Sequence, residues 1–188
     1  MNVMISRDVL RARVARIIAA TRFPFVDQAD WMESNTVIAN VGSNKIWSID
    51  TLDGEVYPSI VVLHVDGSVR EFGQVEMEGD VTETRVPLWR LLSEETGMGV
   101  RVKKFFLYVP EGKELIAEKM LEDNGVEYAG LRTWAVREGN LIVKPYKTID
   151  EEKDHRQTDM FHSPESSAVM AAFHGLRGGE LVHKTINK

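Results

Sequence analysis

The stretch Tyr57–Glu78, YPSIVVLHVDGSVREFGQVEME, decides the fold that the sequence predicts. Two runs rich in β-branched residues flank Asp66-Gly67, a dipeptide typical of tight hairpin turns. We therefore expect a long strand over residues 55–65 and an antiparallel return over residues 69–77. A short strand over residues 46–50 would complete a three-stranded antiparallel meander.

Pairing through this turn predicts which residues of the two strands lie opposite each other. It puts Leu63 opposite Arg70, and it puts Ser59 opposite Gln74. Because side chains alternate along a strand, Ser59, Gln74 and Glu76 are expected on the same side of the sheet as neighbours.

The segments on either side alternate between helical and extended patterns. Apolar residues recur at helical spacing over three segments, whereas other apolar runs are short and bounded by turn residues. The expected helices cover residues 7–21, 86–95 and 113–124, and the expected further strands cover residues 104–109, 131–136 and 141–143. Residues 22–44 show no regular pattern. This order predicts an α/β layer fold, a central mixed sheet with the meander flanked by helices.

Composition limits the class of protein. The chain has 188 residues, 43% of them hydrophobic, which suits one globular domain with a core and an appendage. No apolar run has the roughly 18 residues of a membrane span, so we expect no membrane association. The chain has no cysteine, which excludes disulfides and thiolate zinc sites, and we expect a cytoplasmic location. The net charge of −6 argues against general coating of nucleic acid.

The composition changes after Lys147, where a charged segment without apolar periodicity begins. We therefore divide the chain into a domain over residues 1–147 and a C-terminal extension over residues 148–188. Within the extension, Ser163-Pro164 is typical of a helix start, and an apolar stripe follows before several glycines. The stripe comprises Val169, Met170, Ala172 and Phe173. Such a segment suits docking on the domain or on a protein partner.

The hairpin and its surroundings resemble the PD-(D/E)XK nuclease superfamily, the restriction-endonuclease-like fold. That family has Pro-Asp at the start of one strand and acidic-x-Lys in the strand paired with it, and PSIVVLHVDGSVREFGQVE has this layout. A leading helix, a Trp-bearing helix after the hairpin, the strand FFLYVP and the helix KELIAEKMLEDNG also fit. The resemblance covers residues 6–145 and implies a restriction-endonuclease-like core.

The motif positions depart from the family in their chemistry. Ser59 stands where the family has its metal-binding Asp, Gln74 stands where it has an acid, and Glu76 stands where Lys is usual. Glu76 and the carbonyl of Val75 would be the remaining ligands for Mg²⁺ or Mn²⁺, which prefer oxygen ligands. A hydroxyl and an amide bring no negative charge, so catalysis is expected to be impaired.

Two functional hypotheses follow from the resemblance. The first is a nuclease-fold protein that has lost ordinary catalysis and binds DNA, or has a structural or interaction role. The alternative is an active Mg²⁺- or Mn²⁺-dependent DNA endonuclease with a rearranged site. For DNA binding the expected residues are Arg11, Arg13 and Arg16 of the leading helix, whereas the ordinary explanation of these charges is a solvated helix face. The resemblance also implies that the chain could form a homodimer.

Overall fold

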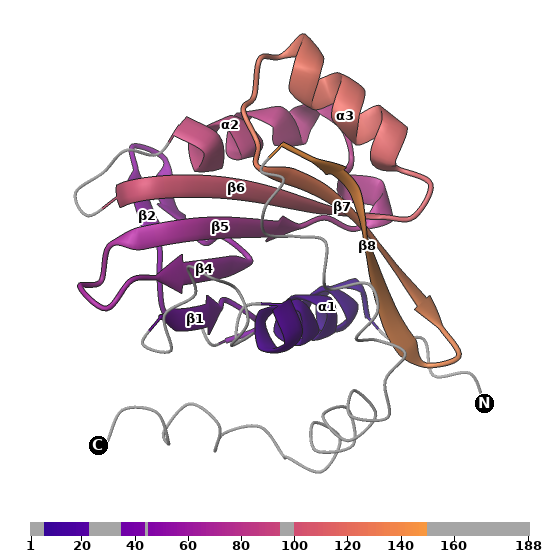
Figure 1. The fold of residues 1–188 in the computed structure, drawn as a ribbon, viewed down its shortest axis with the longest axis horizontal. Helices are drawn as coiled ribbons and strands as arrows, with labels where there is room; N and C mark the ends of the chain where they lie inside the picture. Colours follow the sequence, from indigo (N-terminus) through magenta and orange to yellow (C-terminus); the bar gives the residue numbers. More distant parts are fainter. Residues whose placement is uncertain (1–5, 23–34, 44, 95–99, 150–188) are drawn as a thin grey trace.

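The protein is built around one mixed β-sheet of six strands, with helices on both faces (Figure 1). The computed structural model describes residues 6–22, 35–43, 45–94 and 100–149. The helices are α1 (Arg7–Arg22), α2 (Val86–Glu94) and α3 (Glu114–Asp123), with short 3-10 turns η1 (Glu78–Asp80) and η2 (Glu83–Arg85). The strands are β1 (Thr36–Ala39), β2 (Ile49–Thr51), β3 (Gly54–Val56), β4 (Ile60–Leu63), β5 (Val69–Val75), β6 (Val100–Pro110), β7 (Gly130–Arg137) and β8 (Asn140–Thr148).

Strand order explains how the sheet is built. Six strands lie in the order β1-β4-β5-β6-β7-β8. The pairs at both ends are antiparallel, whereas β5, β6 and β7 run parallel to one another. Parallel neighbours need a crossover connection, and α2 and α3 supply the two crossovers. The predicted α/β architecture with a mixed sheet and flanking helices is therefore confirmed at this level.

Local sequence signals account for the helix ends. Val9 donates its backbone N–H to the Ser6 hydroxyl at 3.4 Å at the start of α1, so Ser6 acts as the N-cap. Asp8 lies in the first turn, where the helix dipole favours a carboxylate. After α3 the chain turns at Gly125, whose φ of +62° suits a residue without a Cβ.

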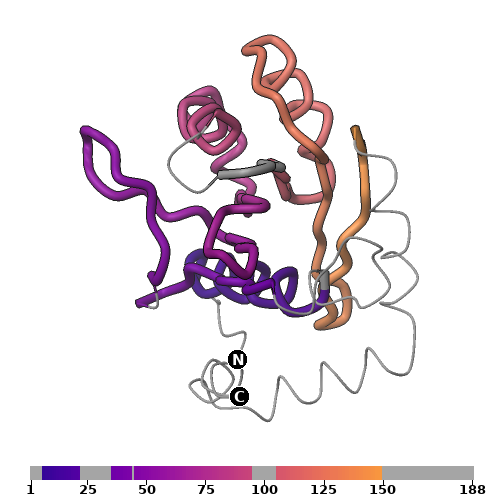
Figure 2. Tube along the Cα trace, turned by 60° about the vertical axis from the view of Figure 1, so that its left-hand side comes forward, coloured from indigo at the N-terminus to yellow at the C-terminus, as the bar shows by residue number. Residues whose placement is uncertain are grey.

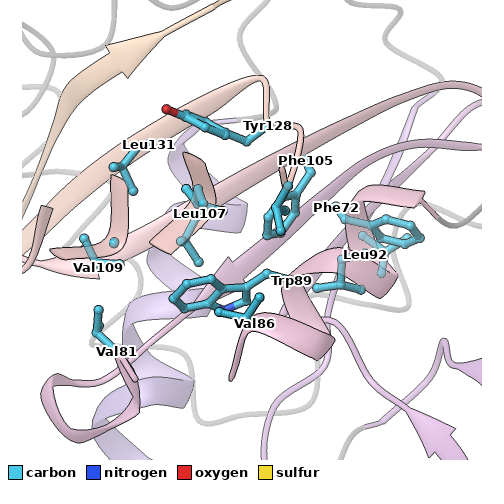
Figure 3. Close-up of a cluster of buried hydrophobic side chains, with 14 of the residues drawn as sticks. Phe72, Val81, Val86, Trp89, Leu92, Phe105, Leu107, Val109, Tyr128 and Leu131 are labelled. Atoms are coloured by element: carbon cyan, nitrogen blue, oxygen red, sulfur yellow. The ribbon is translucent and has the colours of Figure 1, made fainter. Parts of the chain in front are cut away.

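The two faces of the sheet carry separate apolar cores. Helices α2 and α3 cover one face, where Trp89 of α2 packs with Phe72 and Leu107 (Figure 3). Leu121 of α3 belongs to the same cluster. Helix α1 covers the other face through buried residues that include Ile18. Because strand residues alternate between the two cores, the strands in the middle of the sheet contribute apolar side chains to both faces.

The predicted meander is wrong in its first strand. The other strand that pairs with β4, besides β5, is β1, which lies in the stretch that the sequence analysis left irregular. The predicted strand over residues 46–50 instead corresponds to β2, which pairs with β3 in a separate two-stranded sheet. Figure 2 shows this hairpin standing away from the body of the domain. The predicted strand over residues 55–65 is interrupted at residues 57–59, since Pro58 has no N–H to donate to a ladder.

The described part of the chain ends at Ile149, just after β8. The predicted boundary at Lys147 falls within β8, which continues to Thr148. Residues 150–188, including the predicted helix of the extension, lie outside the described residues. Among the helices that the structure describes, none has the length and apolar character needed to cross a membrane.

Candidate functional site

The register of the hairpin differs from the prediction near the turn and agrees with it at the other end. Val61 lies opposite Phe72, which is the register that leads to the predicted pair of Ser59 and Gln74, but Leu63 lies opposite Val69 because a bulge shifts the register there. Arg70 is therefore not the partner of Leu63. A bulge inserts one extra residue into a strand, so the error is confined to the turn side of the bulge.

Ser59 and Gln74 form the polar contact that the register predicts. The Gln74 Oε1 atom accepts hydrogen bonds from the backbone N–H and the hydroxyl of Ser59, both at 3.2 Å. The Ser59 Oγ atom in turn accepts a hydrogen bond from the backbone N–H of Val75 at 3.1 Å. Both polar side chains are buried. These bonds join the start of β4 to the end of β5, because each side chain satisfies the other or a backbone group.

Glu76 is the most enclosed polar residue of the site, with 0% of its surface exposed. Arg85 binds both carboxylate oxygens, through Nε at 3.0 Å and Nη2 at 3.1 Å. Trp89 donates its indole N–H to Oε1 at 2.8 Å, and Gln74 donates its amide to the same oxygen at 3.4 Å. A planar guanidinium that binds both oxygens of a carboxylate is the strongest common form of this pair.

The backbone of Glu76 is fixed as well. Its N–H donates to the carbonyl of Tyr108 in β6 at 2.9 Å, and its carbonyl accepts the indole N–H of Trp134 at 3.1 Å. Trp134 comes from β7, so the residue that follows β5 is bonded to β6, β7, α2 and η2. We refer to Ser59, Gln74, Glu76, Arg85 and Trp89 together as the Glu76 network.

The network has little capacity to hold a divalent cation. A carboxylate binds a metal through an oxygen lone pair, and here the oxygens accept four hydrogen bonds, two of them from a cation. Arg85 thus occupies the position beside Glu76 that a cation would take. Within the described residues, no group of three or more His, Cys, Asp or Glu side chains is arranged to hold a metal. The roles assigned to Glu76 and the Val75 carbonyl as ligands stay predictions.

The other acids near the hairpin are engaged elsewhere. Glu78 is exposed in η1 and lies 3.5 Å from the Lys113 ammonium. Glu55 accepts hydrogen bonds from Tyr57 and Ser48 within the projecting hairpin. Asp50 lies opposite Glu55 in the same hairpin. Among the described residues, none of these three belongs with Glu76 to a group of three or more side chains that could hold a metal ion.

The arginines predicted to bind DNA have different surroundings. Arg11 forms an ion pair with Asp80 of η1, and burial is the largest influence that lowers the pKa of its guanidinium, with Glu76 acting in the opposite direction. Arg13 donates to the Gly139 carbonyl at 3.0 Å, and Arg16 is exposed. Arg11 therefore has a structural contact that Arg16 lacks among the bonds described.

Asp80, Arg85 and Trp89 were not identified from the sequence as partners of the predicted site residues. Asp80 joins α1 to the end of β5: it pairs with Arg7 and Arg11, and it accepts the Met77 N–H at 3.2 Å. A sequence signal for these partners is weak, because an isolated Asp or Arg a few residues after a strand resembles any surface charge.

Comparison with protein-family models, with curated proteins and with solved structures finds no match to this chain.

Proposed function

We propose that this chain is a nuclease-fold protein without metal-dependent catalysis, which acts by binding another molecule. One observation carries the proposal: the carboxylate of Glu76 is fully buried and is already bound by Arg85, Trp89 and Gln74. A metal-dependent nuclease needs acids that are open to a cation and to a scissile phosphate. The Glu76 carboxylate is open neither to a cation nor to a phosphate.

The strand arrangement supports the restriction-endonuclease-like part of the proposal. A leading helix precedes an antiparallel meander, here β1-β4-β5, and a Trp-bearing helix connects it to a parallel strand, β6. The helix α3 and a further strand follow in the order of the family layout. Fold alone does not determine function, so the loss of catalysis is inferred from the site.

DNA is the ligand that we propose for the binding role, through the outer face of α1. Arg13 and Arg16 lie three residues apart on this helix, so they occupy one side of it. Arg11 is left out of the proposed interface because its contact with Asp80 supports the fold. Phosphate binding would depend on salt, since bound cations release counterions from the nucleic acid.

The first test is cleavage. The full chain is incubated with plasmid and with single-stranded DNA in the presence of Mg²⁺ or Mn²⁺, and we expect no product. Cleavage that disappears in Glu76→Gln would reverse the proposal and establish the endonuclease alternative.

The second test is binding, measured as fluorescence anisotropy of labelled DNA over a salt series. We expect Arg13→Ala/Arg16→Ala to weaken binding and to reduce the slope of log affinity against log salt by up to about 2. The matched control is Lys144→Ala, which removes an exposed cation from β8 instead of α1. If the wild-type chain shows no salt-dependent binding, DNA is excluded as the ligand and an interaction role with protein remains.

A further inference from the structure

The β2–β3 hairpin carries a leucine at its tip. Leu52 lies in the turn between Thr51 and Gly54, where polar residues are usual, and its side chain is fully exposed. The hydroxyl of Thr51 donates to the carbonyl of Gly54 at 2.6 Å, which closes the turn. The turn therefore holds a large apolar side chain in solvent.

The base of the hairpin is anchored to the domain. Ile49 is buried in the core on the α2 face of the sheet, and Trp47 packs against Phe72 with 5.3 Å between the ring centroids. Asn40 holds the chain where it enters the hairpin, because its side-chain oxygen accepts the backbone N–H groups of Ile46 and Trp47. An arm that is already fixed at its base binds a partner with little further loss of conformational freedom.

Acidic side chains surround Leu52 on the hairpin. Asp50, Asp53 and Glu55 are all exposed, and residues 48–57 contain no Lys or Arg. This charge disfavours docking on nucleic acid, on an anionic lipid surface or on the hairpin of another copy, because like charges repel. The tip therefore suits a surface that combines an exposed apolar side chain with cations.

Helix α1 carries such a surface on its outer side. Val9 is 58% exposed, Arg16 is exposed and Arg13 is partly exposed. Arg13 follows Val9 by four residues and precedes Arg16 by three, so the three side chains lie along one side of the helix. We call these three residues the α1 stripe. The ion pairs described for α1 involve Arg7 and Arg11 instead.

The tip of the hairpin and the α1 stripe of the same chain belong to different faces of the molecule. The base of the hairpin packs on the face of the sheet that α2 and α3 cover, whereas α1 covers the opposite face. The sheet thus lies between the base of the hairpin and the α1 stripe, and the hairpin projects away from the body of the domain (Figure 2). A contact between the two surfaces would therefore join two copies of the chain.

We propose that the tip of the β2–β3 hairpin docks on the α1 stripe of a second copy of this chain. Leu52 packs against the apolar part of the stripe, and the surrounding carboxylates pair with Arg13 and Arg16. Salt weakens the contact, because ion pairs at a surface are screened. The inference goes beyond the proposed binding of DNA and does not depend on it, although a second copy and DNA would compete for the same two arginines.

Sedimentation velocity of the full chain over a concentration series, without DNA, tests the contact. We expect the wild type to associate with itself, with a dissociation constant that rises with salt. Leu52→Ser should raise this constant by about tenfold, because the contact loses a buried leucine side chain. The matched control is Leu115→Ser, which removes an exposed leucine from α3 and should leave the constant unchanged.

Exchanged charges then identify the two surfaces. Asp50→Arg/Asp53→Arg makes both surfaces positive, and Arg13→Glu/Arg16→Glu makes both negative. Neither variant should associate with itself, whereas an equimolar mixture of the two should associate, because each surface then meets one of opposite charge. Circular dichroism spectra of the separate variants are the control for folding.

Three results would overturn the inference. The wild type could remain monomeric throughout the concentration series. Association could be equally strong in Leu52→Ser and Leu115→Ser. The mixture of the exchanged variants could also fail to associate, which would assign any self-association of the wild type to other surfaces.

Discussion

The substitution Arg85→Met isolates the ion pair at the centre of the Glu76 network. Arg85 supplies two of the four hydrogen bonds to the Glu76 carboxylate and the only positive charge among their donors. Methionine keeps most of the aliphatic length of arginine but donates no hydrogen bond. The substitution therefore leaves a buried carboxylate that is bound only by the neutral donors of Trp89 and Gln74.

The expected cost follows from burial. Removing one partner of a buried ion pair destabilises a protein by about 3–5 kcal/mol, because the remaining charge is uncompensated. Glu76 is 0% exposed, but the side chain of Arg85 is 30% exposed, so water can enter part of the space that the guanidinium leaves. We therefore expect the free energy of unfolding to fall by about 3 kcal/mol, a large part of the 5–15 kcal/mol typical of a domain.

The assay is urea unfolding followed by circular dichroism. Lys113→Met is the matched control: Lys113 has the same exposed fraction of 30%, but its partner Glu78 is 80% exposed, so the cost should stay below about 1 kcal/mol. In Glu76→Gln/Arg85→Met the uncompensated charge is absent, and the cost should be smaller than the sum of the two single substitutions by about 2 kcal/mol. Additive effects, or a loss in Arg85→Met no larger than in Lys113→Met, would refute the structural role of the pair.

Two further predictions concern other parts of the fold. Gly130→Ala should lower the free energy of unfolding by about 1–3 kcal/mol, because a Cβ there would lie 2.6 Å from the buried Arg132 Nη1, whereas Gly79→Ala has no atom within 4 Å and should change little in the same urea assay. Lys147→Met should destabilise the chain at neutral pH. Because the Lys147 hydrogen bond lowers the pKa of Glu118 in the folded chain, this contribution is present above pH 4.5 and is lost as the pH falls through the lower folded value. Unfolding free energies of the wild type and Lys147→Met should therefore converge in acid, and a gap independent of pH would contradict this assignment.

Sequence patterns predicted the elements whose signals are local. The apolar spacing over residues 7–21 predicted α1, and the alternation around Asp66-Gly67 predicted the pairing of β4 with β5. β1 was missed because it is only four residues long and its pairing with β4 depends on residues more than twenty positions away. The bulge in the hairpin was also missed, since the turn sequence favours a two-residue loop and nothing local marks the extra residue.

The sequence predicted which site residues lie next to one another better than it predicted which groups bind the Glu76 carboxylate. The register brought Ser59 next to Gln74, and the structure has hydrogen bonds between them. Two partners of Glu76, Arg85 and Trp89, come from η2 and α2, and no pairing rule connects those elements to the hairpin. Whether a buried carboxylate is free or bound depends on such tertiary contacts, so the sequence left both hypotheses about catalysis open.

Calorimetric titration of the full chain with Mn²⁺ tests the central claim most directly. The Glu76 network should bind no cation, because Arg85 already occupies the carboxylate. The account predicts the same heats for the wild type and for Glu76→Gln, with no saturable binding in either. Saturable binding of Mn²⁺ to the wild type that is lost in Glu76→Gln would contradict it.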